Sequence, residues 1–300
     1  MAGAPAWPCR GKDEEMVSVK SLIGAGAAAL ISGSAFAADL GAPPPAMAYQ
    51  PPVQVSEQSG WYLRGDVGAG AQNFSTFDLE PAANVPASWT VNQKDIQSAS
   101  IIGGGIGYEL NSWLRFDVTG EYRTAAAFKA LGSYNQGTCT VIGVTGTCFD
   151  NYSGNFQAAV FMANAYVDLG TWWCLTPYVG GGVGMAYDRI TGVQDIGPLP
   201  PGTVGFGYTQ TDSANWNLAW NLQAGLTYNV SDNLKIDFNY RYLNMGSPAS
   251  ADIFCQNSGT TTPCNNFNLK DMTSNDFRIG VRYMLNPAPA PVIMPLSTRG

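Results

Sequence analysis

Charged side chains that could do chemistry recur in this sequence as base and acid pairs two residues apart. The clearest pairs are Arg64 with Asp66, Arg115 with Asp117, and Lys235 with Asp237. Paired carboxylates could perform acid–base catalysis, and aligned charges could select ions. A neighbouring base keeps each carboxylate ionised, which makes it a poor proton donor. The pairs therefore favour an ion-pair network or an ion pathway over a catalytic site.

Several classes of chemistry are excluded by what the sequence lacks. It has no histidine, which removes Ser-His-Asp catalysis, zinc sites built on histidine, and the histidine base of an enzyme that would act on lipid. The net charge of -7 argues against nucleic acid as a partner. We predict that the protein is not an enzyme and that it has no cofactor and no metal site.

The residue pairs lie in segments with the period of a β-strand, most clearly in a hairpin between residues 215 and 242. In its second arm Leu234, Ile236 and Phe238 alternate with Lys235 and Asp237. The first arm alternates large apolar residues with Asn and Gln, and Ser231 to Asn233 supply the turn. One apolar face and one polar face are typical of a strand that lies between lipid and a polar lumen.

Eight such strands are predicted, and short and long connections alternate between them. They are Trp61–Phe74, Ile96–Leu110, Trp113–Ala126, Asn155–Leu169, Leu175–Ile190, Asn215–Val230, Leu234–Tyr242 and Asn275–Tyr283. The pattern predicts an all-β fold, an eight-stranded antiparallel up-and-down transmembrane β-barrel with long outer loops and short periplasmic turns.

The strand parity places a cluster of charged residues in the lumen. It consists of Arg64, Asp66, Glu109, Arg115, Asp117, Glu121, Arg123, Asp168, Lys235, Asp237, Arg241, Asp276, Arg278 and Arg282. Seven bases meet seven acids, so mutual pairing could neutralise the cluster. At about eight strands the lumen is just wide enough for side chains to fill, which favours a polar plug. The alternative is a narrow porin-like channel for ions or small solutes.

Outward-facing aromatic residues are predicted at two levels, as an aromatic girdle requires. The lower level holds Trp61, Tyr108, Tyr228 and Tyr283, and the upper level holds Tyr122, Tyr187, Trp216, Tyr242 and Phe277. Outer-membrane lipid and lipopolysaccharide are the expected partners of this face.

The two ends of the chain have the composition of processing and linker segments. Residues 16–37 have a short apolar run and the small residues of a signal peptide, with cleavage expected between Ala37 and Ala38. Residues 1–15 form a poor start for such a signal, which indicates a non-native start and Met16 as the true one. We expect a Pro-rich periplasmic linker at 38–59, the outer-membrane barrel at 60–285, and a Pro-rich tail at 286–300.

Four cysteines form two short-range pairs in predicted loops. The pairs are Cys139 with Cys148 and Cys255 with Cys264, and they predict disulfides in an oxidising compartment; unpaired loop thiols are the alternative. Cys174 has no evident partner in the sequence.

Three segments together resemble the small outer-membrane β-barrel family that is common in alphaproteobacteria, often called porin-like or opacity-type. They are Gly60 to Gly68 (GWYLRGDVG), Leu234 to Tyr242 (LKIDFNYRY) and Asp276 to Leu285 (DFRIGVRYML). The resemblance covers Trp61 to Leu285. It implies a barrel in the cell outer membrane, folded by the barrel-assembly machinery. Family members tend to end near an aromatic residue, whereas Asn286 to Gly300 continue beyond it here.

The family also implies a role for the protein. We expect a structural outer-membrane protein that contributes to envelope integrity and to surface interaction through its extracellular loops. A surface ligand on a host, a phage or another bacterium is one expected partner of these loops, and inert shielding loops are the alternative.

Overall fold

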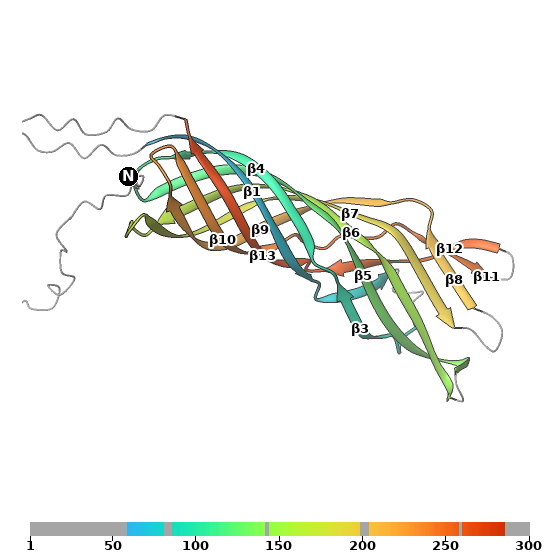
Figure 1. The fold of residues 1–300 in the computed structure, drawn as a ribbon. Coiled ribbons are helices and arrows are strands. Elements are labelled where there is room, and N and C mark those ends of the chain that lie inside the picture. Colours follow the sequence, from blue (N-terminus) through green and yellow to red (C-terminus); the bar gives the residue numbers. More distant parts are fainter. Residues whose placement is uncertain (1–58, 81–85, 142–143, 199–203, 258–259, 286–300) are drawn as a thin grey trace, which may run out of the picture.

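Eight strands close into an antiparallel barrel in the computed structural model, which describes residues 59–80, 86–141, 144–198, 204–257 and 260–285 (Figure 1). The barrel strands are β1 (Gly60–Asn73), β4 (Ala99–Glu109), β5 (Leu114–Val141), β6 (Val144–Asp168), β7 (Leu175–Pro198), β9 (Ser213–Asn229), β10 (Leu234–Asn244) and β13 (Thr273–Met284). Each pairs with the next in this order, and β13 pairs with β1 to close the ring. The predicted eight-stranded fold is confirmed.

Side chains alternate between the interior and the exterior of this ring. In β1, Tyr62 and Arg64 are at most 6% exposed, whereas Trp61 and Leu63 are 51% and 47% exposed. The alternation follows from the period of two in the sequence, because successive side chains of a strand point to opposite faces. Within the described ranges, no helix is long and apolar enough to cross a membrane.

The two ends of the barrel are built differently. Residues 110–113, 169–174 and 230–233 form short connections at the end where β1 begins and β13 finishes. At the other end β5, β6 and β7 continue well beyond the ring, where they form one sheet with five further strands. These are β2 (Thr76–Glu80), β3 (Thr90–Ile96), β8 (Val204–Thr209), β11 (Ile253–Asn257) and β12 (Thr260–Lys270).

We call this extension the distal sheet: β2, β3, β8, β11 and β12 together with the far halves of β5, β6 and β7. Its strand order is β2-β12-β11-β8-β7-β6-β5-β3. The sequence analysis predicted long polar loops in this region. Its predicted strands corresponding to β5 and β7 end too early, and the one corresponding to β6 begins too late. The loops form strands instead because several of them contribute alternating apolar residues to a shared core, such as Phe77 and Leu79 of β2 and Phe267 and Leu269 of β12.

Two β-bulges reverse the side-chain alternation where the ring meets the distal sheet. In β5 the register shifts between Arg123 and Ala126, so that Thr124 and Ala125 are both exposed and Ala126 is buried. In β7 the extra residue is Gly192, whose φ of 61° suits glycine. Beyond the bulges Phe128 and Val193 therefore face inward.

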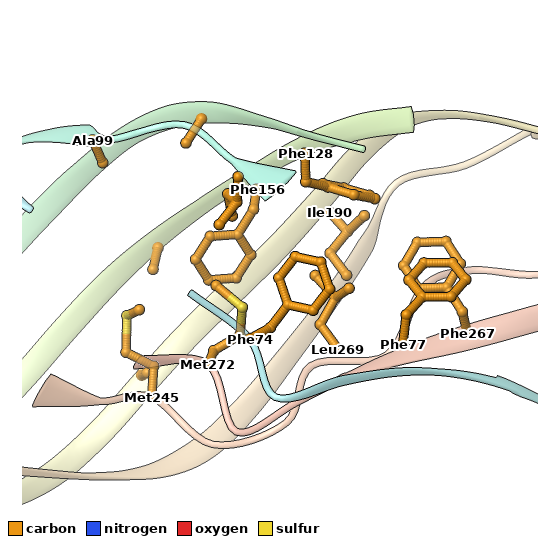
Figure 2. Close-up of a cluster of buried hydrophobic side chains, with 14 of the residues drawn as sticks. Phe74, Phe77, Ala99, Phe128, Phe156, Ile190, Met245, Phe267, Leu269 and Met272 are labelled. Carbon is orange, nitrogen blue, oxygen red and sulfur yellow. The ribbon is translucent and has the colours of Figure 1, made fainter. Parts of the chain in front are cut away.

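An apolar core, shown in Figure 2, is formed by the inward residues beyond the bulges together with inward residues of the ring such as Val160 and Met162 of β6. Phe77 of β2 stacks on Phe267 of β12, with ring centroids 4.5 Å apart, although about 190 residues separate them. Phe128 of β5 meets Phe267 edge-on at 5.7 Å. The interior thus has two storeys: a charged one inside the ring, and an apolar one that begins at the distal end of the ring and fills the distal sheet.

Candidate functional site

The interior of the ring is the candidate site, because the structure gathers the predicted lumen charges there. Beside the bulge of β5, Arg123 binds Asp276 with 2.8 Å between nitrogen and oxygen. Arg241 binds both Asp276, at 2.7 Å, and Glu121, at 2.6 Å. Arg278 approaches Glu121 at 3.6 Å. Strands β5, β10 and β13 supply these residues, so the ion pairs join strands that are not all neighbours in the ring.

A second group of ion pairs lies nearer the short turns. Arg282 of β13 binds Asp237 at 2.6 Å and Glu109 at 2.9 Å. Lys235 of β10 also binds Glu109 at 2.9 Å. Thr227 donates to Asp237 over 2.6 Å and accepts from Arg282. Every carboxylate of this group therefore faces at least one cation.

Arg64 of β1 connects its own strand to β5, across the intervening β4, in the middle of the ring. Its guanidinium binds Asp66 at 2.6 Å and Asp117 at 2.7 Å, and Arg278 reaches Asp66 at 3.2 Å. The hydroxyl of Tyr62 donates to Asp117 over 3.1 Å. Because Arg278 also approaches Glu121, this group and the group beside the bulge form one network.

Arg115 occupies an aromatic cage in addition to its ion pair. Its guanidinium carbon lies 4.1 Å from the ring centroid of Tyr166 and 4.4 Å from that of Tyr178. Its Nε donates to Asp168 over 3.1 Å. Cation–π contacts of this kind gain strength where water is excluded, and only 1% of Arg115 is exposed.

All fourteen residues that the parity placed in the lumen are found in the interior and take part in ion pairs there. Seven positive and seven negative groups leave the network neutral overall. Buried ion pairs offset the cost of losing water only when most polar atoms are satisfied, and removing one partner leaves a costly buried charge. The arrangement can therefore lock strands together across the ring.

The sequence prediction did not include two sets of interior residues. One is an amide chain on β6, β9 and β10, in which Asn221 donates to Asn164 over 2.9 Å and Asn239 donates to Gln223 over 3.2 Å. The amide face of residues 215–229 was its sequence signal. The other is the apolar core of the distal sheet, whose signal was the short Phe-x-Leu pattern at Phe77 and Phe267.

Three of the predicted site cysteines lie in described segments. Cys255 and Cys264 form a disulfide that joins β11 to β12, with Cα atoms 5.8 Å apart. Cys148 is also disulfide-bonded, and its predicted partner Cys139 lies where side chains are not described. Cys174 is disulfide-bonded as well, so the expectation that it lacks a partner was wrong. That expectation arose because no cysteine lies near Cys174 in the sequence.

Other predicted features at the chain ends fall outside the described residues. These are the cleavage site at Ala37 and Ala38, the linker up to residue 58, and the tail 286–300. Among the residues that the structure describes, no group of three or more acidic, cysteine or histidine side chains could hold a metal ion.

The exterior of the ring is apolar and carries its aromatics at two levels. Trp61 lies 5.2 Å from Tyr108 near the short turns, and Tyr187 lies 5.0 Å from Trp216 toward the distal sheet. Between these levels the exterior is formed by aliphatic residues such as Leu222, which is 60% exposed. A closed ring with an apolar exterior and a polar interior defines a protein that crosses a membrane with strands.

Comparison with known proteins agrees with this class. The family model described as "Outer membrane protein beta-barrel domain" matches residues 25–284, so the chain belongs to this outer-membrane family and lies in the cell outer membrane. An uncharacterized protein of Brucella suis is 34% identical over 205 residues, covering 65% of this chain and 71% of its own.

Two further relatives cover more of the chain. Outer membrane protein PagN of Salmonella typhimurium is 28% identical over 236 residues, covering 76% of this chain and 91% of its own. A Rickettsia prowazekii protein with the provisional name of adhesin is 25% identical over 227 residues, covering 74% and 86%. The chain is thus similar over most of its length to a protein named as an outer membrane protein and to one named as an adhesin.

Proposed function

We propose that this protein is a non-catalytic outer-membrane barrel that supports envelope integrity and binds surfaces through its distal sheet. The observation that carries the proposal is the two-storey interior, with an ion-pair network in the ring and an apolar core from the distal end of the ring into the distal sheet. Such an interior resists solute flow and makes a rigid base for the distal sheet. The short turns then face the periplasm and the distal sheet faces outward, as in barrels of this kind.

The closed interior favours this role over the narrow channel. A solute would have to displace ion pairs such as Arg123 with Asp276, and then cross the core around Phe128 and Phe267. Buried ion pairs lose several kcal/mol when one partner is left alone, about 3 to 5 in measured cases. That barrier supports a plug in place of a pore.

The distal sheet supports a binding role because it is built as a folded unit. It buries Phe77, Phe128 and Phe267 at no more than 1% exposure, and the Cys255 to Cys264 disulfide fixes one of its hairpins. A rigid surface loses less entropy on binding than a mobile loop does. The provisional adhesin name of the Rickettsia relative agrees with a host surface as partner.

Other partners follow from the location. The two aromatic levels would contact lipid and lipopolysaccharide, and the barrel-assembly machinery would insert the chain. Acid–base catalysis is not part of the proposal, because each of the seven carboxylates of the ion-pair network is held by a cation.

Binding of bacteria that express the full chain tests the proposal. A non-adherent Gram-negative strain would carry either the wild-type chain or a variant in which residues 132–150 are replaced by Asn-Gly. This two-residue turn would join Leu131 directly to its partner Asn151, so the variant keeps the ring and loses the end of the β5–β6 hairpin.

Heat-modifiable migration on a gel would show that both barrels are folded. We expect the wild-type chain to increase attachment to cultured epithelial cells and the trimmed variant to lose that increase. Attachment equal to that of the empty strain on every cell type would contradict the proposal.

A further inference from the structure

Among the residues that the structure describes, the distal sheet does not close as the ring does, and it leaves two free strand edges. Among the described pairings β2 is bonded only to β12, and β3 only to β5 (Figure 1). β2 follows β1 and leads away from the ring, whereas β3 leads back toward β4. The two edges therefore run in opposite directions on the two sides of a gap.

A cleft lies between these edges. Its volume is about 750 Å³, and residues 75–79 and 86–94 line most of it. Phe77 and Leu79 of β2 and Trp89 and Val91 beside and within β3 give it apolar walls. Trp89 is held in place by the ring of Tyr152, which it meets edge-on at 6.1 Å.

Two polar groups in the cleft lack the partners that they would normally have. Lys94 Nζ donates to the carbonyl of Phe74 over 2.6 Å and to the carbonyl of Ser75, and it forms no ion pair with a described carboxylate. The indole N–H of Trp89 is buried and has no hydrogen-bond partner among the described residues. The cleft is thus lined by a cation without a described counter-ion, and the indole N–H of Trp89 is an unused donor buried in its wall.

We infer that this cleft binds an extended peptide segment of a partner protein, which adds as a strand to the free edge of β2 or β3. The inference rests on the proposed surface-binding function and names its site. The apolar side chains of the bound peptide would pack on Phe77 and Trp89, and a carboxylate of the peptide would pair with Lys94.

The chemistry of the edges selects a peptide over other occupants. A free strand edge presents backbone N–H and C=O groups in a regular row, and another peptide backbone matches that row. A glycan or an acyl chain could use Trp89 but would leave the edge groups unmatched. Because β2 and β3 run in opposite directions, one added strand is antiparallel to one edge and parallel to the other.

Peptide binding to the full chain in lipid nanodiscs tests the inference. The probe is a pooled set of fluorescein-labelled heptapeptides that alternate threonine with valine, phenylalanine or tyrosine and end in a free carboxylate. Fluorescence anisotropy gives the dissociation constant. We expect saturable binding that weakens about tenfold or more when alternate backbone nitrogens of the peptide are methylated, since several hydrogen bonds are lost.

The cation is tested by pairing a peptide change with a protein change. Replacing the terminal carboxylate by an amide should weaken binding to the wild-type chain and leave binding to Lys94→Gln unchanged. Lys129→Gln is the matched control, because Lys129 is an exposed lysine on the neighbouring strand β5 and does not line the cleft.

Two results would overturn the inference: no saturable binding to folded protein, or binding that N-methylation does not weaken, which would indicate a glycan-like or lipid-like site. If Lys94→Gln still distinguished carboxylate from amide, the role of Lys94 would be wrong. If the peptides did not bind but the bacteria still attached to cells, only this binding site would be wrong. If the bacteria also failed to attach, the proposed function would be wrong.

Discussion

Arg123 and Asp276 form a two-point ion pair across the interior of the ring. The Nη2 of Arg123 lies 2.8 Å from Oδ1 of Asp276, and Nη1 lies 3.0 Å from Oδ2. Strands β4 and β1 separate β5 from β13 in the ring, so this contact spans the lumen instead of following the sheet. Both residues are 0% exposed. The pair marks the level at which the charged storey gives way to the apolar one.

Arg123→Ala should destabilise the barrel strongly, because Asp276 and Glu121 would each lose a buried partner. We expect the free energy of unfolding to fall by about 3 to 5 kcal/mol. Urea titration in lipid vesicles, followed by tryptophan fluorescence, measures it. Arg189→Ala is the control, since its ion pair with Asp212 is 48% and 41% exposed at the side chains and should contribute about 0 to 1 kcal/mol. Equal losses in the two variants would argue against a stabilising network.

Leu222→Arg tests the lipid-facing exterior. Leu222 is 60% exposed and lies midway along β9 between Tyr228 and Trp216, which belong to the two aromatic levels. Arginine at the bilayer centre should cost about 2 to 4 kcal/mol of unfolding free energy. Leu222→Ala, which removes apolar area without adding charge, provides the comparison in the same titration. An arginine variant as stable as the alanine variant would show that lipid does not contact this position.

The distal sheet should become less stable as the pH rises. Burial, with a contribution from Asp150, raises the pKa of Asp195 to about 7, and burial raises that of Asp150 to about 6. Raised pKa values mean that the folded state binds protons more tightly than the unfolded chain, whose carboxyl pKa is 3.8. The loss of stability caused by ionising these buried carboxyls is therefore absent below about pH 4. It grows as the pH rises through the folded pKa values, and it is complete above about pH 7.

Amide hydrogen exchange measures this pH dependence strand by strand. After correction for intrinsic rates, opening of β7 beyond Gly192 should become easier between pH 5 and pH 7, by at most about 1.4 kcal/mol per pH unit for each carboxyl. Asp195→Asn should flatten the change. If the distal sheet were equally protected at both pH values, the two carboxyls would not be buried as described.

The ring was predictable from sequence because each strand repeats one local rule. The alternation of Trp61, Leu63 and their inward neighbours Tyr62 and Arg64 assigns both faces without knowledge of the pairing. The same parity placed Arg123 and Asp276 in the interior, since both lie on regular stretches below the bulges. Their direct contact could not be predicted, because it depends on the diameter and register of the closed ring.

The distal sheet was not predictable in the same way. The bulge after Arg123 shifts Phe128 from the exterior parity to the interior, and nothing in the local residue pattern marks the extra residue. β2 and β12 pair Phe77 with Leu269 across about 190 residues, and each strand read alone looks like a polar loop. Only the assembled core shows why these few apolar residues are enough to make both segments fold as strands.

Single-channel conductance of the folded full chain in a planar bilayer tests the closed interior most directly. The account predicts no reproducible openings for the wild-type barrel, and openings only when a variant such as Arg123→Ala breaks the network. Reproducible openings of the wild-type chain that change when Arg115 or Arg241 is neutralised would contradict a plugged lumen and establish the protein as a channel.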